Sequence, residues 1–260
     1  MRAMNSAIEI VLIPCLTDNY GVLIHAAGSG QTASIDAPDG AALRAALDAR
    51  QWPLHTIFTT HHHADHTGGI AALKAHYGCQ VIGPEREADR IPGIDRTVTE
   101  KTPLTFDGCN VRVIETPGHT LGHVSYHFPD AKLAFTGDTL FALGCGRIFE
   151  GDPEMMFNSM QKLAALPGDT TIYCGHEYTL SNGRFALSVE PENEALVARM
   201  AEIERMRAGA QPTLPTTINA EKATNPFLRT QSSTIRARLG MQGKPDWQIF
   251  GRLREMKNKA

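Results

Sequence analysis

The chain has 260 residues, of which 42% are hydrophobic and 20% are charged, and its formal net charge is -3. This length suits one large domain, or one domain with a small appendage, and the composition is that of an ordinary globular protein. The small negative charge argues against a general nucleic-acid binder, and no apolar run approaches the roughly 20 residues that a membrane-spanning helix needs.

Cysteine usage and the N-terminal run bear on location. Five scattered cysteines form no C-x-x-C pair, which is typical of a reducing compartment. The apolar run from Ile8 to Leu16 is interrupted by Glu9 and Pro14 and lacks a small-residue cleavage site, so it predicts a first strand and not a signal peptide. We therefore expect a cytoplasmic, monomeric protein without membrane or nucleic-acid partners.

Strand and helix patterns alternate through the first part of the chain. Short β-branched or aromatic runs predict strands, and runs rich in alanine and leucine predict helices. In chain order these are strands 8–14, 21–25 and 32–35, helix 40–50, strand 57–60, helix 70–77 and strand 81–84.

The middle of the chain returns to strands and the end is helical. The predicted elements are strands 111–116, 123–128 and 132–136, helix 153–166, strand 170–174, helices 181–189 and 192–206, a connection over 209–217, a loop over 225–229, and helices 233–239 and 246–257. Together the patterns predict an α/β fold, with a first domain of residues 1–179 and a small helical domain of residues 180–260.

Four potential metal ligands lie on the loop between the strand 57–60 and the helix that follows it. The pattern H-x-H-x-D-H contains His61, His63, Asp65 and His66. Imidazole is the commonest protein ligand for metals and carboxylate is its usual hard complement, so the set suits zinc, iron or manganese. His62 should point the opposite way on an extended segment, either behind the ligands or into solvent.

Three later turns each follow a predicted strand and supply one further candidate ligand: His119, Asp138 and His176. Seven candidates exceed the three protein ligands that a single catalytic zinc usually takes. Two ions account for all seven, with His61, His63 and His119 on one, Asp65, His66 and His176 on the other, and Asp138 between them. Asp36, at an earlier strand end, either orients a ligand histidine or is a plain turn residue.

The ordered set H-x-H-x-D-H, G-H-T, G-D and G-H resembles the metal-binding pattern of the metallo-β-lactamase superfamily over roughly residues 8–180. The resemblance implies a four-layer αβ/βα sandwich with the ligands on loops at one rim. Two ions about 3.5–4 Å apart can activate a bridging hydroxide and polarise a carbonyl or phosphoryl oxygen, so we expect hydrolysis. Asp65 and Asp138 are the candidate catalytic carboxylates. We expect two divalent ions, in the first place zinc, with iron or manganese as alternatives.

Further segments resemble the hydroxyacylglutathione hydrolases, also called glyoxalase II. They are residues 144–151 (GCGRIFEG), 174–179 (CGHEYT) and 225–229 (NPFLR), together with the helical end. That family hydrolyses S-D-lactoylglutathione and related S-2-hydroxyacylglutathiones to a hydroxy acid and glutathione, so the resemblance implies the same reaction by attack of a metal-bridging hydroxide. A thiolate with a reference pKa of ~8.5 leaves without much help from a general acid, which suits this chemistry.

The glutathione moiety carries two carboxylates at neutral pH, so its binding site needs cations. Arg147 is one candidate, and Arg254 and Lys257, on one face of the last predicted helix, match the R-x-x-K feature of the family. The alternative for that pair is a solvated basic face. Tyr178 either binds the peptide backbone of glutathione or is a partly buried core residue. Many relatives have lysine and tyrosine where this chain has Arg147 and Phe149, so a hydroxyl is lost at the second of these substrate-binding positions.

Three other functions are compatible with parts of the pattern. A sulfur dioxygenase acting on glutathione persulfide would hold one iron by two histidines and a carboxylate, and would not need Asp65, His66 and His176 together. A lactonase or phosphodiesterase of the same superfamily would lack the helix that binds glutathione. A non-enzymatic metal-storage module would lack ligands or an open position, whereas this ligand set is complete.

Overall fold

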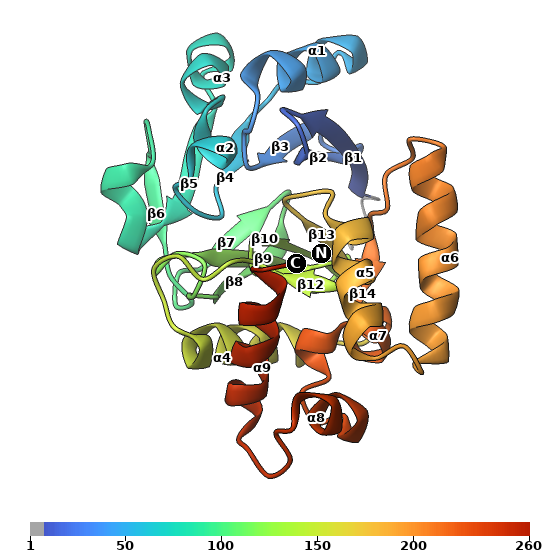
Figure 1. Cartoon of the computed structure of the whole chain (residues 1–260). Helices are drawn as coiled ribbons and strands as arrows, with labels where there is room; N and C mark the ends of the chain where they lie inside the picture. Colours follow the sequence, from blue (N-terminus) through green and yellow to red (C-terminus); the bar gives the residue numbers. More distant parts are fainter. Residues whose placement is uncertain (1–7) are drawn as a thin grey trace. The chain divides into compact units, whose positions relative to one another are not determined.

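The computed structural model describes residues 8–260, which divide into two compact units. Unit 1 runs from the first described residue to Glu115 and adds Gly122–Phe135, while unit 2 combines Thr116–Leu121 with Thr136–Ala260. Figure 1 labels most of the helices and strands of both units. The short segment Thr116–Leu121 therefore belongs to unit 2, although the chain on either side of it belongs to unit 1.

A six-stranded sheet forms the first layer of unit 1. The strands are β1 (Ile8–Cys15), β2 (Asn19–Ala26), β3 (Gln31–Ile35), β4 (Thr56–Phe58), β5 (Gln80–Pro84) and β6 (Arg96–Val98). They lie in sequence order, antiparallel from β1 to β3 and parallel from β3 to β6. β3, β4 and β5 are mostly buried, as expected for parallel strands that are covered on both faces.

Helices α1 (Gly40–Arg50) and α3 (Ile70–Tyr77) pack against this sheet. Leu43 of α1 and Leu73 of α3 share one hydrophobic core with strand residues such as Ile57. Between β4 and α3 in the chain lies the short helix α2, which spans Ala64–Thr67. The core therefore fixes both ends of the segment that carries the H-x-H-x-D-H motif.

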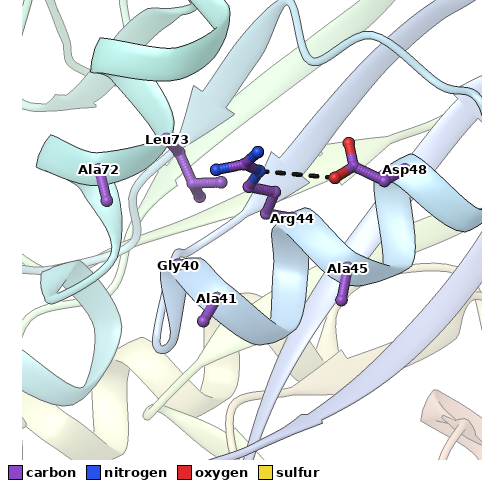
Figure 2. A pocket seen from close by; sticks show the side chains of 7 residues that line it. All are labelled: Gly40, Ala41, Arg44, Ala45, Asp48, Ala72 and Leu73. Carbon is purple, nitrogen blue, oxygen red and sulfur yellow. Dashed lines mark ion pairs between the residues drawn. The ribbon is translucent and has the colours of Figure 1, made fainter.

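A shallow groove runs between α1 and α3 (Figure 2). It is lined by Gly40, Ala41, Arg44, Ala45, Asp48, Ala72 and Leu73. Arg44 and Asp48 form an ion pair of 3.4 Å along the edge of the groove, and both side chains are about half exposed. None of the seven candidate metal ligands lines this groove.

The second sheet of unit 1 is antiparallel. Its strands are β7 (Leu104–Phe106), β8 (Cys109–Glu115), β9 (Val124–Phe128) and the first part of β10 (Leu133–Gly137), with the 3-10 helix η1 (Glu85–Arg90) preceding them in the chain. Phe58 of β4 contacts Tyr126 and Phe128 of β9, with ring centroids 5.3 and 6.4 Å apart. The Tyr126 hydroxyl donates a hydrogen bond of 2.8 Å to the carbonyl oxygen of Thr59. The end of β4, from which the ligand loop departs, is thereby anchored on both sheets.

Unit 2 is mainly helical. Its elements are β11 (Leu140–Phe141), β12 (Gly144–Cys145), α4 (Pro153–Ala164), β13 (Thr171–Cys174), α5 (Thr179–Val189), α6 (Glu194–Ala208), β14 (Thr216–Thr217), α7 (Ile218–Thr224), the 3-10 helix η2 (Pro226–Leu228), α8 (Ser233–Leu239) and α9 (Asp246–Lys257). β11 and β12 form a hairpin, and β13 pairs antiparallel with β14.

Buried contacts tie the hairpin of unit 2 to its helices. Glu221 of α7 accepts the backbone N–H of Leu143 at 2.8 Å, and it pairs with Arg199 of α6 at 2.6 Å. Helix α9 packs on α4, with the rings of Phe157 and Phe250 6.0 Å apart. The hairpin that precedes the candidate substrate residues Arg147 and Phe149 is therefore held by helices α6 and α7.

The predicted α/β class and the helical end of the chain are confirmed. The loop predicted after residue 60 contains helix α2, and residues 218–224, which no prediction covered, form helix α7. Strands β6 and β7 were not predicted either, because each has only three residues, too few for an alternating pattern to show.

The domain boundary expected after residue 179 stays a prediction. Over residues 8–260, every helix is too short or too polar to cross a membrane.

Candidate functional site

The four candidate ligands of the H-x-H-x-D-H motif lie together in unit 1. The segment between β4 and α2 carries His61 and His63, and α2 carries Asp65 and His66. His61 Nε2 lies 3.1 Å from His63 Nδ1, and His66 Nε2 lies 3.8 Å from Asp65 Oδ2. The rings of His61 and His66 are 4.2 Å apart between centroids. Four donor groups are thus gathered on one loop.

Asp36 holds two of these histidines in the orientation that metal binding needs. Its Oδ2 accepts the Nδ1–H of His66 and the hydroxyl of Thr60, each at 2.8 Å, and its Oδ1 accepts the backbone N–H of Thr60 at 2.7 Å. Because Thr60 gives its hydroxyl proton to Asp36, the hydroxyl accepts from Nδ1 of His61 at 3.0 Å. Nε2 of both histidines then carries the lone pair that binds a metal. Of the two roles open to Asp36 from the sequence, the structure shows the orienting one.

Two further contacts of this loop were missed from the sequence. Asn19 Nδ2 donates to the carboxylate of Asp65 at 3.1 Å and to its carbonyl oxygen at 3.0 Å. His62, for which solvent was one of two expected positions, is only 9% exposed, and its backbone N–H and ring both bind Glu87. The partners are 46 and 25 residues distant in sequence, so no local pattern could reveal them.

His119, Asp138 and His176 lie together in unit 2, and all three are nearly buried. Asp138 Oδ2 is 3.4 Å from His119 Nε2 and 3.3 Å from His176 Nε2. One carboxylate oxygen at almost equal distances from two imidazole nitrogens is compatible with a carboxylate shared by two ions.

Tight turns bring the unit 2 ligands together. Gly118, which precedes His119, has a φ of +143°, and a Cβ at this position would lie 2.6 Å from a sulfur atom of α4. A Cβ on Gly146 would overlap the carbonyl oxygen of Asp138. The carbonyl oxygen of Arg147 accepts from Nδ1 of His119 at 2.8 Å, which directs Nε2 of this histidine toward Asp138. The loop with the candidate substrate residues therefore also orients a ligand.

Arg147, Arg254 and Lys257 form a cluster of positive charge in unit 2, here called the basic cluster. Burial lowers the pKa of Lys257, and the charges of Arg254 and Arg147 lower it further. Lys257 Nζ donates to the hydroxyl of Ser181 at 2.8 Å. Arg254 is only 5% exposed and donates to the carbonyl oxygen of Cys145 at 2.7 Å, whereas Arg147 is exposed. Three mutually repelling cations suit a ligand with more than one negative charge.

The two aromatic candidates each flank a ligand histidine. Phe149 is 61% exposed, and its ring meets that of His119 edge to face at 5.2 Å. Tyr178 is half-buried, and its ring stacks on that of His176 at 4.6 Å with an angle of 5° between the planes. Both rings therefore adjoin the histidines of unit 2.

Two family models together match almost the whole described chain. The model described as the metallo-β-lactamase superfamily matches residues 16–176. The model described as the hydroxyacylglutathione hydrolase C-terminus matches residues 177–260. The protein belongs to this fold family and carries imidazole and carboxylate groups whose orientation is fixed by hydrogen bonds. These features indicate that the protein binds divalent metal.

Individual relatives agree with these models. The chain is 58% identical to a hydroxyacylglutathione hydrolase of Brucella anthropi over 258 residues, which is 99% of both chains. A protein of the same name from Brucella canis is 57% identical over the same length and coverage.

Solved structures share the fold at lower identity. ETHE1 from Myxococcus xanthus is 23% identical with a TM-score of 0.68, and the match covers 95% of this chain and 89% of that one. The B3 metallo-β-lactamase BLEG-1 is 23% identical with a TM-score of 0.65, covering 85% of this chain and 99% of its own. These likenesses concern the fold alone.

Proposed function

Because the chain belongs to the hydroxyacylglutathione hydrolase family, within the metallo-β-lactamase superfamily, we propose that it binds two divalent metal ions and hydrolyses S-D-lactoylglutathione and related S-2-hydroxyacylglutathiones. The products are a hydroxy acid and glutathione. The observation that carries the proposal is Asp138, one oxygen of which lies 3.4 and 3.3 Å from two histidine nitrogens. Zinc is the proposed metal, with iron or manganese as alternatives.

The proposed ligand set is the one expected from the sequence. His61, His63 and His119 hold one ion, Asp65, His66 and His176 hold the other, and Asp138 is shared. The support for this assignment is chemical, since hydrogen bonds to Asp36, Thr60 and the carbonyl oxygen of Arg147 occupy Nδ1 of His66, His61 and His119. In each case Nε2 is left as the donor nitrogen.

When bound, the two ions supply a hydroxide nucleophile at neutral pH and polarise the thioester carbonyl. Asp65 and Asp138 are the proposed catalytic carboxylates, placed to accept the proton of the attacking water or to hold that water in line. The side-chain amide of Asn19 donates to Asp65 Oδ2 and so fixes the direction of that carboxylate. The glutathione thiolate leaves without a dedicated acid because its reference pKa is only ~8.5.

The basic cluster is the proposed binding site for the carboxylates of glutathione. Arg147 is exposed, and Lys257 is half-buried beside it, so both can present charge to a bound anion. Phe149 and Tyr178 are the proposed walls of the same site, next to His119 and His176. Phe149 offers an apolar surface in place of a hydroxyl.

An assay of the purified chain on S-D-lactoylglutathione, with metals quantified in the same sample, tests the proposal. We expect release of free thiol and two divalent ions per chain. Absence of hydrolysis in a sample with two ions bound would overturn the substrate assignment. One iron per chain with consumption of oxygen would instead indicate the dioxygenase, an alternative that the named relatives do not favour.

Raising the pH should weaken substrate binding through Lys257. The pKa of Lys257 is lowered by burial and by Arg254 and Arg147, so the ammonium loses its charge at a lower pH than an ordinary lysine does. A carboxylate binds only the charged form, and the KM for the glutathione thioester should therefore rise with pH, by up to about tenfold.

The variant Lys257→Arg serves as the matched comparison, because arginine keeps its charge throughout this range. Initial rates at several pH values, corrected for spontaneous hydrolysis of the thioester, measure both profiles. Identical dependence of KM on pH in the wild type and in Lys257→Arg would refute the assignment of Lys257 to a substrate carboxylate.

The cytoplasmic location, the monomeric state and the absence of membrane or nucleic-acid partners stay predictions from the sequence.

A further inference from the structure

A buried carboxylate lies behind the ligand loop of unit 1. Glu87, on the 3-10 helix η1, is 3% exposed. Its Oε2 accepts the backbone N–H of His62 at 2.7 Å and Nδ1 of the same residue at 2.8 Å, and its Oε1 accepts the backbone N–H of Gly122 at 2.9 Å. One side chain thus receives three hydrogen bonds, two of them from the residue between two candidate ligands.

The position of His62 makes this contact relevant to the ligands. His61, His62 and His63 are consecutive residues, and the ring of His63 lies 4.7 Å from that of His61 and 4.8 Å from that of His62, centroid to centroid. His61 Nε2 and His63 Nδ1 lie 3.1 Å apart, while both donors of His62 reach Glu87. Fixing His62 therefore fixes the direction of both neighbours.

The packing around Glu87 leaves it little freedom. A Cβ on Gly122 would overlap Cγ of Glu87 and lie 3.0 Å from Cβ of Arg86. Gly122 begins the segment that leads into β9, and Val124 of β9 donates to the carbonyl oxygen of Thr60 at 3.0 Å. Helix η1, β9 and the ligand loop are thus joined at this carboxylate.

We propose that Glu87 is a positioning residue for the metal site, which holds His61 and His63 in the geometry for binding an ion by clamping His62 from behind. This inference rests on the proposed metal site, and it assigns a role to a residue that touches neither metal nor substrate. The contact with Glu87 orders the ligand loop before a metal ion binds. The free energy of metal binding is therefore not reduced by the entropy loss of ordering the loop.

The variant Glu87→Gln tests the clamp with little change in volume. Each oxygen of Glu87 faces an N–H group, so either orientation of a glutamine amide places its NH₂ against a donor. In the metal-free protein, we expect amide hydrogen exchange over residues 59–66 to become about tenfold faster. We also expect the zinc dissociation constant, measured by competition with a chromophoric chelator, to rise about tenfold.

Glu85→Gln is the matched control, because Glu85 is an exposed residue of the same helix and loses the same charge. It should leave both exchange and zinc affinity at wild-type values. His62→Phe provides a second test that does not depend on Glu87→Gln folding. It keeps the ring and the backbone N–H but removes the Nδ1 donor, so zinc affinity should fall by a smaller factor, about threefold.

Wild-type zinc affinity in Glu87→Gln, or in His62→Phe if the first variant does not fold, would overturn the inference. So would faster exchange throughout the chain with unchanged zinc affinity, which is the signature of a residue that only stabilises the fold. A wild-type protein that binds no metal would contradict the proposed function instead, and exchange of the loop in the metal-free variants would still decide whether Glu87 clamps it.

Discussion

Replacing Asp138 by alanine should abolish thioester hydrolysis and reduce the metal content of the purified protein. The carboxylate lies 3.4 Å from His119 Nε2 and 3.3 Å from His176 Nε2, and it is 6% exposed. Loss of a residue that only orients a ligand usually costs about 10–100-fold in metal affinity or activity, so loss of a shared ligand should cost more, on the order of a thousandfold in kcat/KM. Metal analysis of the purified variant, together with the thioester assay, measures both effects.

Two companion variants make the result specific. Asp138→Asn keeps an oxygen but loses the charge, and it should retain more metal than Asp138→Ala while hydrolysis stays strongly impaired. Asp130→Ala removes an exposed carboxylate and should behave as the wild type. Full metal content together with normal turnover in Asp138→Ala would rule out the shared-ligand role.

The ligands could be predicted from the sequence because each lies in a short, recognisable sequence pattern. His61, His63, Asp65 and His66 are packed into six residues, and His119, Asp138 and His176 each follow a strand and a glycine. Such signals need only a window of a few residues.

Apart from Asp36, for which orienting a ligand was one of two expected roles, the residues that hold the ligands could not be predicted, because they act across the chain. Asn19 reaches Asp65 over 46 residues, and Glu87 reaches His62 over 25. A glutamate in a short polar stretch has the pattern of a solvated surface residue, and only the packing of η1 against the loop buries it. Helix α7 was missed for a related reason: burial of Ile218 and Glu221 in unit 2 stabilises this short helix, and burial depends on residues distant in the chain.

The burial of Arg254 was missed although the helical period of the last helix was predicted correctly. The three-residue spacing of Arg254 and Lys257 predicts that the two cations lie on one face of the last helix. The same spacing puts Arg254 on the buried stripe, where it is 5% exposed, while Phe250 and Leu253 are fully buried. The solvated basic face that was the alternative for this pair therefore does not describe Arg254, whose guanidinium is 5.4 Å from the Phe227 ring.

Arg254→Ala should consequently impair both substrate binding and stability. The guanidinium donates to the carbonyl oxygen of Cys145 at 2.7 Å, to the Sγ of the same residue at 3.9 Å and to Asn258 at 3.0 Å. Its five N–H groups exceed these three bonds, so a substrate carboxylate can also be bound. Losing the bond to the buried carbonyl oxygen should lower the free energy of unfolding by about 1–3 kcal/mol. Losing a charged partner of the substrate should raise KM roughly 10- to 100-fold, with kcat little changed.

The two effects separate when three variants are compared by urea unfolding and by steady-state kinetics. Arg252→Ala removes an exposed arginine from the same helix and should change neither property, because its partner Glu255 is also exposed. Arg254→Lys keeps the charge but not the planar fork of donors, so it should recover part of the affinity and little of the bond to Cys145. If Arg254→Ala lowers kcat as much as it lowers kcat/KM, its side chain acts on the transition state, and a pure binding role is refuted. If stability falls while KM stays at the wild-type value, Arg254 is a structural support of the β12 loop, and the carboxylate of the substrate must be bound by Arg147 and Lys257.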